Sequence, residues 1–161
     1  MSNSSGRATI RNPLEVISEL SDPLKAERLA ENARIRGNKE VEHAARQRAL
    51  LLRAKAIGAS NEFETDLNFA LLAYEEVLAR RNGKRQLASR TRQMIAKYGP
   101  LEAVARIVRR GHDAVGFSAL IDLGLTDYTF ESLALKNSEK FDAETIETAK
   151  QNLRAAGLDD L

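Results

Sequence analysis

The sequence predicts an all-α fold, a compact single domain built as a bundle of about seven or eight helices. Ala and Leu, with 24 and 21 residues, outnumber the 14 Val and Ile residues, and Trp is absent, so the composition favours helix over strand. Apolar residues also recur at spacings of three and four along most of the chain. At 161 residues the chain can bury one substantial core. We expect a flexible polar tail over residues 1–12 and a single helical domain over 13–158.

Three helices are predicted in the part of the chain that ends at Gly58. Asn12 and Asp22 each precede a proline, and proline fits the first position of a helix. These pairs therefore predict helices that start at residues 13 and 23. A glycine and an asparagine at 37–38 separate the second helix from a third, which Gly58 ends.

The longest predicted helix is capped by Asn61 and stopped by Asn82-Gly83. Seven apolar residues recur at spacings of three and four along it: Phe63, Leu67, Ala70, Leu71, Tyr74, Val77 and Leu78. We expect this helix to lie at the centre of the core.

The charge of the chain is concentrated in residues 80–112. This segment contains ten Lys or Arg and one acid, Glu102, a net charge of +9, whereas residues 1–79 carry −1 and residues 113–161 carry −6. The net charge of +2 therefore hides a strongly basic middle segment. Proteins that bind nucleic-acid backbones concentrate positive charge in this way.

The basic segment divides at Tyr98-Gly99-Pro100, because glycine ends helices readily and proline begins them. We predict two helices, about 85–97 and 100–110, that form a basic helical hairpin over residues 84–110. The inward stripes are Leu87, Thr91, Met94, Ile95 and Tyr98 on the first helix and Leu101, Val104, Ala105 and Val108 on the second. The candidate phosphate-binding residues are Arg85, Arg90, Arg92, Lys97, Arg106, Arg109 and Arg110.

Three further helices are predicted towards the end of the sequence. A short apolar helix over 117–123 comes first, and a Thr-Asp pair at 126–127 caps the next. Asp142 caps the last helix, where Phe141 and Ile146 form a hydrophobic staple.

The basic hairpin has three interpretations. It is a solvated charged face of the kind that most helical proteins have, a surface that contacts nucleic acid, or a surface that binds an acidic protein. The acidic partner in the third case includes the C-terminal segment of a second copy of this chain, which would make a homo-oligomer. The expectation of nucleic acid depends on the abundance of Arg, whose planar group suits phosphate oxygens, and on the lack of neighbouring acids in the sequence.

We expect the nucleic acid to be DNA rather than RNA, bound through its phosphates. A helix-turn-helix would present polar base-reading residues near the start of its second helix. Here that helix begins Pro100-Leu101-Glu102, and its arginines lie at the far end. Contact with phosphates is therefore better supported than reading of base edges.

Arg106 and His112, with five residues between them, resemble the Arg-x(4–6)-His motif of the HEPN family of helical ribonucleases. The resemblance implies that Arg and His stand together at a dimer groove and assist RNA cleavage by the 2′-hydroxyl, work that suits a histidine near neutral pH. In the alternative interpretation, His112 is a polar residue at a helix end. Apart from this HEPN-like alternative, we expect no enzymatic activity.

Other classes of site lack their residues in this sequence. There is no cysteine and there are only two histidines, which excludes disulfides and Cys-ligated zinc or iron–sulfur sites. No glycine-rich phosphate loop or Gly-x-Ser-x-Gly nucleophile motif occurs, so we expect neither a cofactor nor a metal. No apolar run approaches the ~20 residues that cross a bilayer. Residues 1–7 lack the apolar core of a secretory signal, so we expect a cytoplasmic protein.

Overall fold

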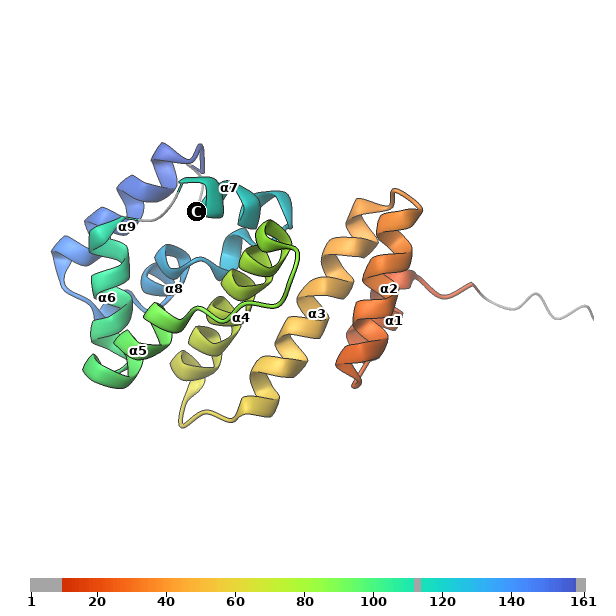
Figure 1. The fold of residues 1–161 in the computed structure, drawn as a ribbon, viewed down its shortest axis with the longest axis horizontal. Helices are drawn as coiled ribbons and strands as arrows, with labels where there is room; N and C mark the ends of the chain where they lie inside the picture. Colours follow the sequence, from red (N-terminus) through yellow and green to blue (C-terminus); the bar gives the residue numbers. More distant parts are fainter. Residues whose placement is uncertain (1–9, 112–113, 159–161) are drawn as a thin grey trace, which may run out of the picture. The chain divides into compact units, whose positions relative to one another are not determined.

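The computed structural model describes residues 10–111 and 114–158, and these ranges hold nine α-helices, two short 3-10 turns and no β-strand (Figure 1). The helices are α1 (Pro13–Glu19), α2 (Pro23–Ile35), α3 (Lys39–Ile57), α4 (Glu62–Asn82), α5 (Ser89–Tyr98), α6 (Pro100–Arg110), α7 (Ala114–Asp122), α8 (Phe130–Lys136) and α9 (Ala143–Ala155). The 3-10 turns are η1 (Thr126–Tyr128) and η2 (Ser138–Lys140). The predicted all-α class is confirmed.

The chain divides into two compact units, one up to Ala49 and one from Leu50 onward, with α3 running across the boundary. Each unit has hydrophobic clusters of its own. The expectation of a single domain over 13–158 stays a prediction, because this grouping does not show whether the units unfold separately.

Capping side chains start the helices largely where the sequence predicts. The Oδ1 atoms of Asn12, Asp22, Asn61 and Asp142 accept hydrogen bonds from backbone N–H groups two or three residues further on. One predicted cap was wrong: residues 126–127 form a 3-10 turn, and the cap of α8 is Thr129, whose Oγ1 accepts from the Ser132 N–H at 3.0 Å.

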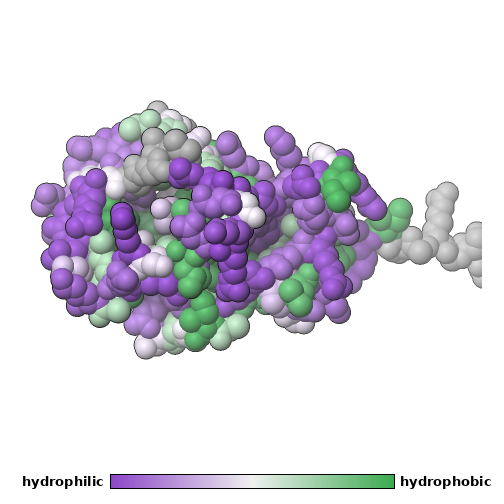
Figure 2. Space-filling view, in the orientation of Figure 1, coloured by the Kyte–Doolittle hydropathy of each residue, from purple (hydrophilic) through white to green (hydrophobic). Residues whose placement is uncertain are grey.

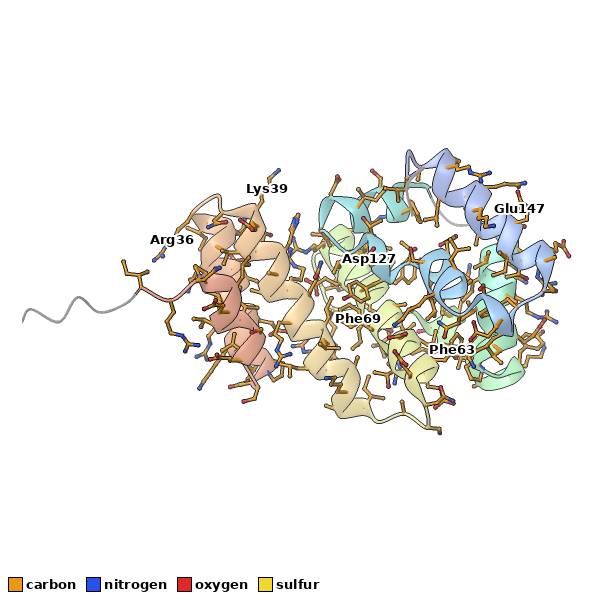
Figure 3. The ribbon with its side chains drawn as sticks, turned by 180° about the vertical axis from the view of Figure 1, so that it is seen from behind. Arg36, Lys39, Phe63, Phe69, Asp127 and Glu147 are labelled. Carbon is orange, nitrogen blue, oxygen red and sulfur yellow. The ribbon has the colours of Figure 1, made fainter. Side chains whose placement is uncertain are left out.

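The first unit is held by a small cluster in which Ile17 meets Ala30 and Ala45, with Val41 half-buried beside them. Most of its buried hydrophobic residues are alanines, which remove little apolar area from water. At the turn between α2 and α3, Arg36 and Lys39 are exposed and point away from the helices (Figure 3).

The second unit is organised around α4, which contributes buried residues to two clusters (Figure 1). On one side Phe63 and Leu67 pack with residues of α6, α8 and α9. On the other side Phe69, labelled in Figure 3, packs with residues of α3 and α7. Its ring stacks on that of Tyr128 at a centroid distance of 3.7 Å. The prediction that this helix is the centre of the core is confirmed.

Hydrophilic residues cover most of the visible face of each unit, with apolar residues scattered among them (Figure 2). Within residues 10–111 and 114–158, no helix combines the length and the apolar character needed to span a membrane.

Candidate nucleic-acid interface

Helix α5 begins at Ser89, four residues later than the predicted start near Arg85. Gly83 ends α4 in the left-handed conformation, and the chain from Lys84 to Ala88 is not helical. The residue before α5 is Ala88, whose side chain makes no capping hydrogen bond. Arg85 consequently lies in the exposed connection before α5, and Leu87, which was expected to be buried, is 48% exposed.

The late start of α5 has a cause in α4. Glu75 Oε1 accepts hydrogen bonds from the Ala88 N–H at 2.9 Å and from Arg92 Nε at 2.7 Å, and its Oε2 accepts from Arg92 Nη2 at 2.9 Å. Ala88 is therefore held against α4 just before the helix begins. Only 8% of Glu75 is exposed, so the carboxylate that holds Ala88 and Arg92 is buried. Hydrogen bonding to Glu75 raises the pKa of Arg92.

Helix α6 follows α5 after a single residue, Gly99, and the two helices lie side by side (Figure 1). Val104 and Val108 are fully buried in the cluster that contains Phe63. Leu101, which was expected to face inward, is 41% exposed instead. The arginines of α6 lie on its outer side.

Two of these arginines have a carboxylate neighbour on their own helix. Glu102 Oε1 accepts from Arg106 Nε at 2.7 Å and from Arg109 Nη2 at 3.4 Å. Arg109 also donates through Nε to the Ala105 carbonyl. The idea that the hairpin lacks neighbouring acids was therefore wrong in part, because Glu75 and Glu102 together pair with three of its seven candidate cations.

An aromatic ring lies among the cations. Tyr98 is 37% exposed, the Arg106 guanidinium lies over its ring at 3.8 Å from the centroid, and Lys97 Nζ lies 5.0 Å from the same point. Hydrogen bonding and charge from Lys97 lower the pKa of the Tyr98 phenol, and the charges of Arg106 and Arg110 act in the same direction. At this end of the α5–α6 pair an exposed ring thus lies among positive charges.

The remaining candidate cations have no carboxylate partner among the described residues: Arg85, Arg90, Lys97 and Arg110. All four are exposed. They are thus available to an external anion.

A cavity of about 350 Å³ lies in the second unit, bordered by helices α4 to α8 and the residues between them. Its walls are mainly apolar, formed by Met94, Ile107, Phe117, Leu120 and Phe130, with Tyr74 beside them. Arg90 and Arg110 also line it, as does Glu131, which is 2% exposed and accepts from Asn152 Nδ2 at 3.2 Å. The cavity therefore joins the basic surface to the core of the unit.

The structure places the predicted residues in three groups. Arg92 is engaged with Glu75, Arg106 and Arg109 share Glu102, and the other four cations lack carboxylate partners in the described part of the chain. His112 lies outside the described residues, so the Arg106–His112 pair of the HEPN resemblance has no geometry here. The sequence predicted a buried Tyr98, whereas the structure leaves its ring partly exposed. The basic residues around it, Lys97, Arg106 and Arg110, were all among the predicted phosphate-binding residues.

In comparisons with known proteins, no protein-family model, curated protein or solved structure matches the chain. Among the described residues, no group of three or more His, Asp or Glu side chains is placed to hold a metal ion.

Proposed function

We propose that the protein binds nucleic acid, DNA rather than RNA, by contacting backbone phosphates with the exposed cations of the α5–α6 pair and the connection before it. The observation that supports this most directly is that four candidate cations are exposed and that the described residues supply none of them with a carboxylate: Arg85, Arg90, Lys97 and Arg110. Each such cation can neutralise one phosphate and release its condensed counterions.

The surroundings of Tyr98 support the same proposal. An exposed aromatic ring among Lys97 and Arg106 resembles the surfaces on which nucleic-acid strands bind, where cations follow the backbone and aromatic rings contact bases. Arg106 keeps its Glu102 partner, so we assign it a weaker phosphate contact than Lys97 or Arg110. Arg92 positions α5 through Glu75 and contributes to the surface indirectly.

The test is a fluorescence-anisotropy titration of labelled duplex DNA and of RNA at about 50 and about 200 mM salt. RNA is included because phosphate contacts alone discriminate poorly between the two. The variant Lys97→Gln/Arg110→Gln removes two exposed charges from the proposed surface. Each lost phosphate contact should reduce the slope of log K against log salt by about 0.9, so the double variant should reduce it by about two.

A matched control is available at the turn between α2 and α3. Arg36→Gln/Lys39→Gln removes the same net charge from two exposed positions that are not part of the proposed surface. This control should retain both the affinity and the salt slope. Equal losses in the two double variants would indicate binding by net charge alone, and absence of binding at the lower salt would move the proposal to an acidic protein partner.

A further inference from the structure

The cavity bordered by helices α4 to α8 is lined mainly by apolar side chains, which a surface that contacts only phosphates does not need. Its volume of about 350 Å³ falls within the ~300–1,000 Å³ range typical of small-molecule sites. It is lined by residues of α4, α5, α6, α7 and α8, and two of the exposed arginines lie on its wall. Because Arg90 and Arg110 are exposed, the cavity reaches the molecular surface at the proposed interface.

The interior of the cavity suits a planar, largely apolar group. Tyr74 and Phe130 line it and form an edge-to-face pair with ring centroids 6.4 Å apart, and Met94, Ile107 and Phe117 complete the apolar wall. Aromatic walls of this kind favour stacking of another ring.

A few polar groups accompany these walls. The hydroxyl groups of Tyr74 and Thr91 have no hydrogen-bond partner among the described residues, and both residues are only half-buried. The carboxylate-bearing Glu131 also belongs to the wall. The occupant should therefore offer groups that hydrogen-bond to hydroxyls, and a negative charge beside Glu131 would be repelled.

The two guanidinium groups on the wall favour an occupant that carries a negative charge. Arg90 and Arg110 come from different helices and both line this cavity, and the described residues supply neither with a carboxylate. The complementary ligand thus has a flat, hydrogen-bonding body and an anionic end.

We infer that the cavity receives the base of one unpaired nucleotide, while Arg90 and Arg110 hold the phosphate attached to it. This inference rests on the proposed function, since the nucleotide belongs to the strand whose other phosphates lie on the α5–α6 surface. A base, of which adenine is a test case, presents hydrogen-bonding edges to such hydroxyls together with a face that stacks between aromatic side chains. The protein would then favour DNA that contains an unpaired base over fully paired duplex.

The experiment compares three labelled duplexes of the same length by anisotropy: one fully paired, one with a single bulged adenosine, and one in which the bulged nucleotide lacks its base. Stacking of one base in an aromatic site predicts about tenfold tighter binding of the adenosine bulge than of either other duplex. The abasic bulge separates recognition of the base from any effect of DNA bending.

Variants of α5 test whether the cavity causes the preference for the adenosine bulge. Met94→Trp fills the cavity from α5, and it should reduce binding of the adenosine bulge to the level of the paired duplex. Ala96→Trp adds the same side chain at an exposed position of α5 that does not line the cavity, and it should keep the tenfold preference. Thr91→Val, which keeps the shape of the side chain and removes one hydroxyl, should weaken the preference severalfold and covers the case in which Met94→Trp fails to fold.

The outcomes separate the two proposals. Equal binding of all three duplexes by the unaltered protein would overturn the nucleotide site and leave phosphate binding intact. A preference that survives both Met94→Trp and Thr91→Val would show that the base lies elsewhere and would also overturn the inference. Failure to bind any of the duplexes would overturn the proposed function, and the nucleotide site with it.

Discussion

Glu75 determines where α5 starts, because its carboxylate accepts hydrogen bonds from both the Ala88 N–H and the Arg92 guanidinium. The pair is bidentate, and the carboxylate side is almost completely buried whereas the Arg92 side chain is 40% exposed. Removing Glu75 would leave a buried backbone donor without a partner, which costs more than the loss of an exposed ion pair.

We therefore expect Glu75→Ala to lower the free energy of unfolding by about 2 kcal/mol, since it removes hydrogen bonds to a charged group in a buried setting. Chemical denaturation monitored by circular dichroism would measure this. The neighbouring Glu76, which pairs with Arg80 at 3.4 Å on a more exposed part of α4, provides the control. Glu76→Ala should cost less than about 1 kcal/mol. Equal effects of the two substitutions would contradict the role given to Glu75.

The pKa of the Tyr98 phenol depends on the electrostatic potential of the basic surface. Lys97 lowers the pKa of its phenol, with smaller contributions from Arg106 and Arg110, whereas burial raises the pKa of Tyr128. On raising the pH, phenolate absorbance from Tyr98 should therefore appear before that from Tyr128. Lys97→Gln removes the main cause and should shift the Tyr98 step upward, towards its ordinary value of 10.0.

The assignment of this titration is checked by Tyr98→Phe, which should remove the early step and leave the late one. An unchanged early step in Lys97→Gln would mean that Lys97 does not set the potential at the ring. The positive potential around Tyr98 would then be weaker than the charges of the neighbouring side chains suggest.

At the scale of elements, the joint between α5 and α6 depends on the backbone of one residue. Gly99 has φ 82° and ψ 166°, a region that is open essentially to glycine alone, whereas Gly83 has φ 68° and ψ 6°, the left-handed conformation that Asn also adopts. A Cβ atom would meet nothing within 4 Å at either position, so backbone conformation alone distinguishes them.

We expect Gly99→Asn to destabilise the protein by about 1–3 kcal/mol, the cost of a strained backbone. Gly83→Asn should cost about 1 kcal/mol or less, because Asn tolerates the left-handed conformation. Thermal unfolding of the two variants gives the comparison. Similar losses of stability in the two variants would show that the joint does not need the glycine-only backbone conformation at residue 99.

The elements that the sequence predicts well are those with local signals. Asn61 and Gly83 bound α4, and its apolar period marks the buried side, so this helix needs no information from elsewhere in the chain. The start of α5 could not be predicted, because it depends on a hydrogen bond between Ala88 and Glu75, thirteen residues earlier. The same limit applies to the site: the cations were evident, but the cavity is assembled by five helices and leaves no pattern in the sequence.

At the scale of the whole molecule, the two units differ in what fills their interiors. In the first unit Ile17 packs against Ala30 and Ala45, whereas the second buries larger side chains that include Phe63 and Phe69. The free energy gained by burial scales with the apolar area removed from water, at roughly 25 cal/mol per Å². An interior of alanines therefore stabilises the first unit less than the second.

This difference predicts graded protection in native-state hydrogen exchange. Amides of α2 should exchange at lower denaturant and with a smaller opening free energy than amides of α4, because local opening follows the stability of each cooperative unit. Mass spectrometry of peptides from the two helices measures both, and α6 provides an internal control because Val104 and Val108 pack in the same cluster as residues of α4. Amides of α6 should exchange with those of α4. If α2 instead opens together with α4 at the same free energy, residues 13–158 unfold as the single domain that the sequence predicts, and the alanine-rich interior is not the weaker one.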